Sequence, residues 1–260
     1  MSSPRSQTIV VWLSLILFLI YGLSFGFLLR MVPLVSPSWD AEQVAQFYRE
    51  RETLIKTGAM LCSWTGAFMI PLVSVITLQL IRVERRLTVW SVMTALGGAM
   101  MSLYLCLPPM FWGVAAYSVN RNPDITLLMH ELANLTMTTT DQFYIFEWLG
   151  IAVVCFLPTV VKNSPFPRWY GYVTAWTAVM FEAGAIAFLP RKGVFAWDGL
   201  FVFWSPLVLF CGWILLTVGL LLTKLKAQRL EAEAGTEQAF DLYTPAGQED
   251  LDRGRAVAQA

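Results

Sequence analysis

The sequence predicts an all-α protein, a polytopic transmembrane helix bundle of six spans with two amphipathic interfacial helices on its outer side. Of its 260 residues 57% are hydrophobic and 14% are charged, whereas a soluble globular domain carries about 25% charged residues. The apolar residues also gather in runs long enough to cross about 30 Å of hydrocarbon. Together these observations exclude an ordinary soluble domain.

Six apolar runs define the predicted spans. The first follows Arg5 as a signal peptide would, but it is too long for one and ends in Leu29-Arg30 rather than at a small-residue cleavage site, so we expect it to be retained. A helical stretch precedes the fourth run, and we place a break between the two at the threonines of residues 136–140. The predicted spans are residues 9–29, 58–81, 88–115, 142–161, 169–189 and 200–222.

The lysines and arginines beside the span ends predict the orientation. With the N-terminus inside, nine of them fall on the cytoplasmic side, mostly in short loops, and seven fall on the outer side. We therefore expect both termini in the cytoplasm. Residues 1–226 form the transmembrane bundle, and residues 227–260 form an acidic tail that continues the last helix briefly and is then disordered.

The two longest loops then lie on the outer side, and both read as helices. Asp40 is placed to cap a helix within residues 38–55, with Val44, Phe47 and Leu54 on its apolar face. Residues 123–136 show a similar pattern. These helices either cover the span ends or gate a cavity.

Two acidic residues lie inside predicted spans, where ionisable groups are costly and are candidates for a functional site. Glu147 lies about six residues from the outer end of span four, and Glu182 lies about seven residues from the outer end of span five. We expect them to share a depth and to approach one another. They then act either as interhelical hydrogen-bonding groups or as a carboxyl pair with a shared proton.

Other polar and aromatic side chains gather at the same level, while the inner halves of the spans are mostly aliphatic. This asymmetry predicts a pocket that opens to the outside. Its candidate ligand-binding residues are Tyr21, Trp64, Tyr104, Tyr144, Glu147, Glu182, Asp198 and Trp204, of which Glu147 and Glu182 are also the candidate catalytic residues. Asp198 has a structural alternative, since it can pair with Arg191 or cap span six. Asp141 is either the cap of span four or a further site residue.

No metal or cofactor is expected. The four cysteines lie singly within apolar runs, as small buried hydrophobes. His130 is the only histidine, which excludes a multi-histidine metal centre, and we expect it on the solvated side of the second outer helix. The net charge of zero predicts no nucleic-acid partner.

Several segments carry a resemblance to known proteins. They are Pro37-Ser38-Trp39-Asp40-Ala41-Glu42-Gln43-Val44-Ala45-Gln46-Phe47-Tyr48, Ile55-Lys56-Thr57-Gly58-Ala59, Phe166-Pro167-Arg168-Trp169-Tyr170-Gly171-Tyr172 and Gly193-Val194-Phe195-Ala196-Trp197-Asp198-Gly199-Leu200. With them the chain resembles a family of uncharacterised bacterial six-span integral membrane proteins. The resemblance implies a multi-pass protein of the bacterial inner membrane and implies no activity.

Three classes of function stay open. The first is a protein that binds a hydrophobic small molecule in the outward-facing pocket, or an accessory subunit that joins other membrane subunits. The second is an intramembrane enzyme in which Glu147 and Glu182 act as acid and base on a lipophilic substrate such as an isoprenoid or steroid. The third is a transporter, against which the aliphatic inner halves of the spans argue.

Overall fold

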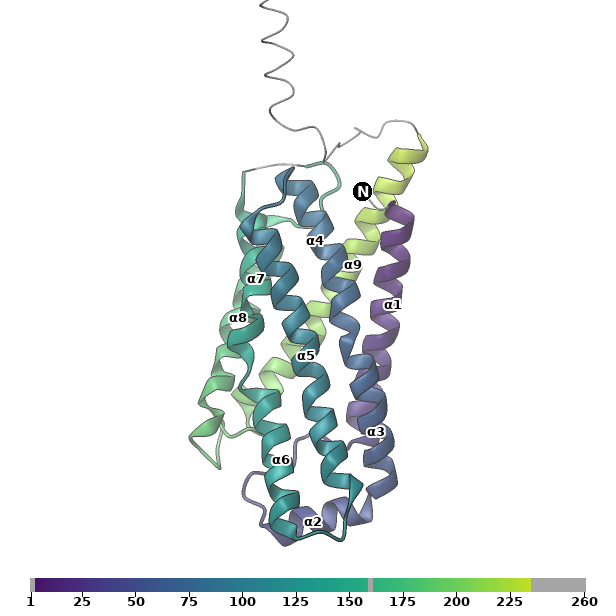
Figure 1. Cartoon of the computed structure of the whole chain (residues 1–260). Coiled ribbons are helices and arrows are strands. Elements are labelled where there is room, and N and C mark those ends of the chain that lie inside the picture. Colours follow the sequence, from purple (N-terminus) through teal and green to yellow (C-terminus); the bar gives the residue numbers. More distant parts are fainter. Residues whose placement is uncertain (1–2, 159–160, 235–260) are drawn as a thin grey trace, which may run out of the picture.

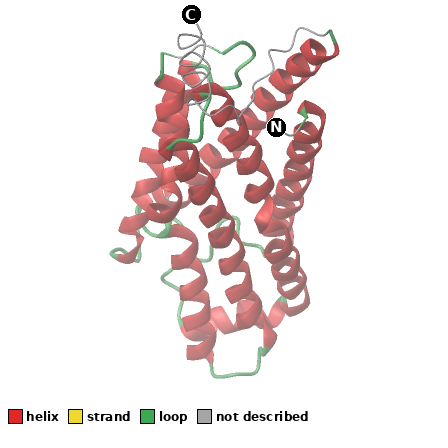
Figure 2. Cartoon of the chain, turned by 45° about the horizontal axis from the view of Figure 1, so that its top comes forward, coloured by secondary structure: helices red, strands yellow, loops and turns green. Residues whose placement is uncertain are grey.

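A computed structural model describes residues 3–158 and 161–234, and every regular element in these ranges is a helix (Figure 2). The elements in chain order are α1 (Pro4–Leu23), η1 (Ser24–Leu28), α2 (Ala41–Glu50), α3 (Glu52–Thr65), η2 (Gly66–Phe68), α4 (Met69–Glu84), α5 (Val89–Tyr117), α6 (Pro123–Thr138), α7 (Asp141–Phe156), α8 (Arg168–Phe181), η3 (Glu182–Phe188), η4 (Leu200–Trp204) and α9 (Ser205–Glu233). The all-α prediction is therefore confirmed.

Four helices of the described residues are long and apolar enough to cross a membrane, which indicates a membrane-embedded protein. They cover Pro4–Leu28, Glu52–Glu84, Val89–Tyr117 and Leu200–Glu233. Predicted spans four and five correspond to α7 and to α8 with η3, which are not among these four.

The long helices pack side by side as a closed ring. Helix α1 contacts α4 and α9, α9 contacts α8, α8 contacts α7, α7 contacts α5, and α5 contacts α3 and α4. The start of α1 and the end of α9 lie at one end of the bundle, and α2 lies across the opposite end (Figure 1). We call these the terminal end and the α2 end.

Two glycines permit close packing between α5 and α7. A Cβ atom added at Gly97 would lie 2.4 Å from the backbone nitrogen of Glu147, and one at Gly150 would lie 2.3 Å from the hydroxyl oxygen of Thr94. Since transmembrane helices associate largely by packing, small residues at such crossings let the backbones approach.

The helix breaks follow local signals. Asp40 caps α2 in a reciprocal capping box with Gln43, as expected from its position before the helix. Helix α2 ends at Glu50 and α3 begins at Glu52, so Leu54 belongs to the long helix and is exposed. The break at the threonine cluster is confirmed, because α6 ends at Thr138 and α7 begins at Asp141.

Helix α6 is turned opposite to its predicted orientation. Its polar residues Thr126, His130 and Asn134, spaced four apart, are buried, while the apolar Ile125 and Leu128 are exposed. The prediction that His130 is solvated is therefore wrong. The predicted tail from residue 235 onward lies outside the described residues.

Candidate functional site

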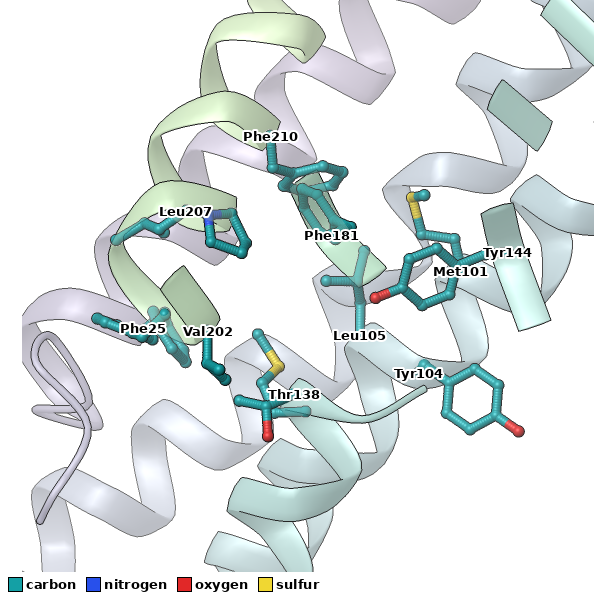
Figure 3. A pocket seen from close by; sticks show the side chains of 13 residues that line it. Phe25, Met101, Tyr104, Leu105, Thr138, Tyr144, Phe181, Val202, Leu207 and Phe210 are labelled. Atoms are coloured by element: carbon teal, nitrogen blue, oxygen red, sulfur yellow. The ribbon is translucent and has the colours of Figure 1, made fainter. Parts of the chain in front are cut away.

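A cavity of about 90 Å³ lies inside the ring, among α5, α6, α7, α8, α9 and the irregular segments η1 and η4. A single water needs roughly 10–15 Å³ of such space, so there is room for several non-hydrogen atoms. Thirteen mostly apolar side chains line it (Figure 3): Phe25, Met101, Tyr104, Leu105, Met137, Thr138, Tyr144, Phe181, Val202, Phe203, Pro206, Leu207 and Phe210.

Irregular helical segments converge on this cavity. Phe25 lies in the π-helical turn η1, and Val202 and Phe203 lie in the π-helical turn η4. Phe181 directly precedes η3, a 3₁₀ helix of seven residues, whereas such helices rarely exceed four residues. Because π-helical turns occur frequently at functional sites, this convergence favours the cavity as the site.

The polar part of the cavity wall centres on Tyr144. Figure 3 shows its hydroxyl directed toward the space between the lining residues. This hydroxyl donates a 2.8 Å hydrogen bond to Oδ1 of Asp141, one turn earlier on α7. Asp141 therefore does not line the cavity itself but contacts it through the Tyr144 hydroxyl.

The second carboxyl oxygen of Asp141 faces η3. A Cβ atom added at Gly184 would lie 2.2 Å from this Oδ2 atom and 2.0 Å from the carbonyl oxygen of Thr138, so only glycine fits there. Asp141 is 3% exposed, and its Oδ2 has no hydrogen-bond partner in the described chain. Glu182 at the start of η3 is near enough to interact electrostatically with the Asp141 carboxyl.

Tyr21, a predicted ligand-binding residue, has a structural role. Helix α5 contains Pro109, which has no N–H and so leaves the carbonyl of Leu105 without its helical partner. The Tyr21 hydroxyl donates to this carbonyl over 3.0 Å. It thus satisfies a backbone group that could find no water in hydrocarbon.

The other predicted candidates divide into those at the cavity and those away from it. Tyr104 and Tyr144 line it, although Tyr104 points its hydroxyl away from the other lining side chains (Figure 3). Trp64 is 75% exposed, and Trp204 is exposed as well. Asp198 is half-buried and is in no ion pair of the described residues, since Arg191 pairs with Glu131 at 3.6 Å instead.

The structure places Glu147 and Glu182 in different surroundings. Glu147 is fully buried at the α5–α7 crossing, and neither of its carboxyl oxygens has a hydrogen-bond partner among the described residues. Glu182 is exposed, and the acid in electrostatic range of it is Asp141. The two glutamates are neither hydrogen-bonded to one another nor part of the cavity lining.

At the α2 end, His130 connects two helices. Its Nδ1 lies 2.9 Å from the Tyr48 hydroxyl of α2, and the Asn134 amide donates to its Nε2 over 2.8 Å. The ring also meets Trp197 edge-on. Burial lowers the pKa of His130 to about 3, so the imidazole is neutral at physiological pH.

At the terminal end, three buried glutamine side chains connect the helices. The Gln79 amide of α4 donates to Gln7 of α1 and to Gln228 of α9, over 2.7 and 3.2 Å. Gln228 donates in turn to Gln79 and to the carbonyl oxygen of Asn163. These bonds hold α1, α4 and α9 together on the side of the bundle remote from the cavity.

In comparisons with known proteins, no family model, no curated protein and no solved structure matches the chain. The resemblance to bacterial six-span membrane proteins therefore stays a prediction.

Most cavity residues were missing from the prediction. Phe25, Phe181, Phe203 and Phe210 are ordinary apolar residues of predicted spans, and nothing in their spacing separates them from residues that face lipid. Asp141 was predicted as either the cap of span four or a further site residue, but its link to Tyr144 was not. The signal that could have found it is its i, i+3 spacing with Tyr144, which places both on one face of α7.

Proposed function

We propose that this is a six-span protein of the bacterial inner membrane that binds a hydrophobic small molecule in the cavity around Tyr144. The observation that carries the proposal is an aromatic cavity with one polar position, bounded by irregular helical turns. Small-molecule sites are usually concave and apolar, with few polar groups that fix the orientation of the ligand. Both features are present here.

The lengths of the shorter helices support six spans. Sixteen residues of α7 extend about 24 Å, and α8 with η3 extends about 35 Å, close to a hydrocarbon thickness of about 30 Å. Their outward side chains are apolar: Phe143, Phe146 and Leu149 on α7, and Trp176 and Val179 on α8, are exposed. These residues would face lipid.

The proposed orientation has the terminal end in the cytoplasm. The loops after α4 and α7 and the last turns of α9 hold the basic residues that the positive-inside rule assigns to that side. Reporter fusions after Lys162 should then give cytoplasmic signals, and fusions at Asn122 should give extracytoplasmic ones. The reverse pattern would contradict the orientation and would turn the cavity to the cytoplasmic side.

The alternative functions have less support. A transporter needs a polar path through the inner halves of the spans, and these are mostly aliphatic. An enzyme based on Glu147 and Glu182 needs both acids at one site, and they differ in burial. No specific observation favours an accessory subunit over a binding protein.

A cavity-filling variant tests the proposal. Leu207 lines the cavity, whereas Val208 beside it on α9 is 66% exposed. We expect ligand-observed ¹⁹F NMR with 4-fluorotoluene, in neutral maltoside micelles, to detect binding to the wild type and to Val208→Trp. Leu207→Trp should abolish that binding. Equal line broadening for all three proteins would show partition into the micelle only and would refute the proposal.

A further inference from the structure

We infer that the ligand of the cavity is a lipophilic organic cation, an amine whose apolar body fills the aromatic space and whose ammonium group lies at Tyr144. This inference rests on the proposed function and adds the charge of the ligand. It combines an incompletely paired buried acid, a second acid beside it, and an aromatic lining.

The Asp141 carboxyl, hydrogen-bonded to the lining residue Tyr144, lacks a positive partner among the described residues. Asp141 is almost fully buried, and its Oδ2 atom has no hydrogen-bond partner in the described chain. A buried carboxylate is costly unless a positive charge or several donors stabilise it. The Tyr144 hydroxyl supplies a single donor to Oδ1. Oδ2 itself faces Gly184, so a cation would act from the Oδ1 side, at the Tyr144 hydroxyl, where it would bring a positive charge close to the carboxyl.

The charged residues around Asp141 are acidic. Glu182 adds a further acid in electrostatic range of Asp141. Neither acid is in an ion pair of the described residues, and Arg191, which follows η3, pairs with Glu131 and is exposed. Negative charge on these two acids would favour a cationic ligand at Tyr144 over an anionic one.

The cavity lining is rich in aromatic side chains. Six of its thirteen side chains are aromatic: Phe25, Tyr104, Tyr144, Phe181, Phe203 and Phe210. Aromatic faces attract organic cations and do so more strongly when water is excluded. The Tyr144 oxygen can accept a hydrogen bond from an ammonium group while its own O–H continues to donate to Oδ1 of Asp141. The hydrogen bond to Asp141 thus makes the Tyr144 oxygen a better acceptor for an ammonium group in the cavity.

Three probes with one apolar body test the inference. 4-Fluorobenzylamine, 4-fluorobenzyl alcohol and 4-fluorobenzoate share one small apolar body and differ chiefly in charge. Binding is measured by ¹⁹F NMR in neutral maltoside micelles, with Leu207→Trp as the baseline for micelle partition. We expect the wild type to bind the amine at least tenfold more tightly than the alcohol, and the carboxylate most weakly.

The matched variants are Asp141→Asn and Asp124→Asn. The first keeps an oxygen that accepts from Tyr144 and removes the charge, so the preference for the amine should fall to about twofold while the alcohol still binds. The second makes the same change of net charge on the exposed first turn of α6 and should behave as the wild type. Should Asp141→Asn not fold, Tyr144→Phe removes the hydroxyl that links Asp141 to the cavity and should also reduce the preference.

The possible failures are distinguishable. If none of the three probes binds above the Leu207→Trp baseline, the proposed function fails. If the alcohol binds as tightly as the amine, the cavity binds ligands but the inference about charge is wrong. If the preference for the amine survives in both Asp141→Asn and Tyr144→Phe, Asp141 is not its source, and the inference is likewise overturned.

Discussion

The hydrogen bond between Tyr21 and the Leu105 carbonyl can be tested with a double-mutant cycle. Tyr21→Phe removes the hydroxyl and leaves a buried carbonyl without a donor, because Pro109 has no N–H to offer. A lost buried hydrogen bond costs about 0.5–1.5 kcal/mol, and an unsatisfied partner raises the cost toward 1–3 kcal/mol. Interhelical bonds in one membrane protein average about 0.6 kcal/mol. We therefore expect a loss of about 1–2 kcal/mol in the free energy of unfolding.

The second arm of the cycle restores the backbone donor. Pro109→Ala supplies an N–H that can bond to the Leu105 carbonyl within α5, so Tyr21→Phe should cost less than about 0.5 kcal/mol in that background. Reversible unfolding in mixed SDS and maltoside micelles measures each free energy, and Tyr172→Phe at an exposed position gives the baseline. An equal cost of Tyr21→Phe in both backgrounds would refute the reasoning.

Three further predictions concern packing, an unpaired acid and pH. Gly97→Ala should destabilise the protein by about 1–3 kcal/mol, because its Cβ meets the α7 backbone, whereas Gly212→Ala, with open space around it, should be neutral or stabilising; equal effects in thermal unfolding would contradict this. Glu147→Met should raise the free energy of unfolding by about 1–3 kcal/mol, since it removes carboxyl oxygens that have no partner among the described residues; a loss of stability would contradict this. Because burial lowers the pKa of His130 to about 3 from about 6.5 in the unfolded chain, the native state resists protonation, and stability should fall by up to about 1.4 kcal/mol per pH unit as pH drops below 6.5; His130→Gln should flatten this slope between pH 6.5 and 5.

The sequence predicted the helical class and several helix boundaries because these depend on local chemistry. The Asp40 cap, the apolar runs and the threonine break each act within a few residues. The prediction that the polar side of α6 is solvated was wrong, and the reason is physical. In a soluble helix the apolar stripe faces the core, but here the polar stripe faces inward, because the His130 ring finds hydrogen-bond partners there in Tyr48 and Asn134.

The candidate site was predicted only in part, because depth along a span does not determine the direction of a side chain. Tyr104 and Tyr144 lie at the cavity, whereas Trp64 points outward. The predicted depth of Glu182 requires a regular α-helix, but this residue begins the 3₁₀ helix η3. The π-helical turns η1 and η4 have no recognisable composition, so the convergence of irregular segments could be found only in the structure.

The central claim is that the cavity around Tyr144 holds a small lipophilic molecule. Native mass spectrometry of the wild type, Leu207→Trp and Val208→Trp, each released from the membrane in the same neutral detergent, tests it most directly. We expect one additional mass below that of a membrane phospholipid on the wild type and on Val208→Trp, and none on Leu207→Trp, because Leu207 lines the cavity and Val208 does not. The same additional mass on Leu207→Trp, or no such mass on the wild type, would show that the cavity does not hold this molecule.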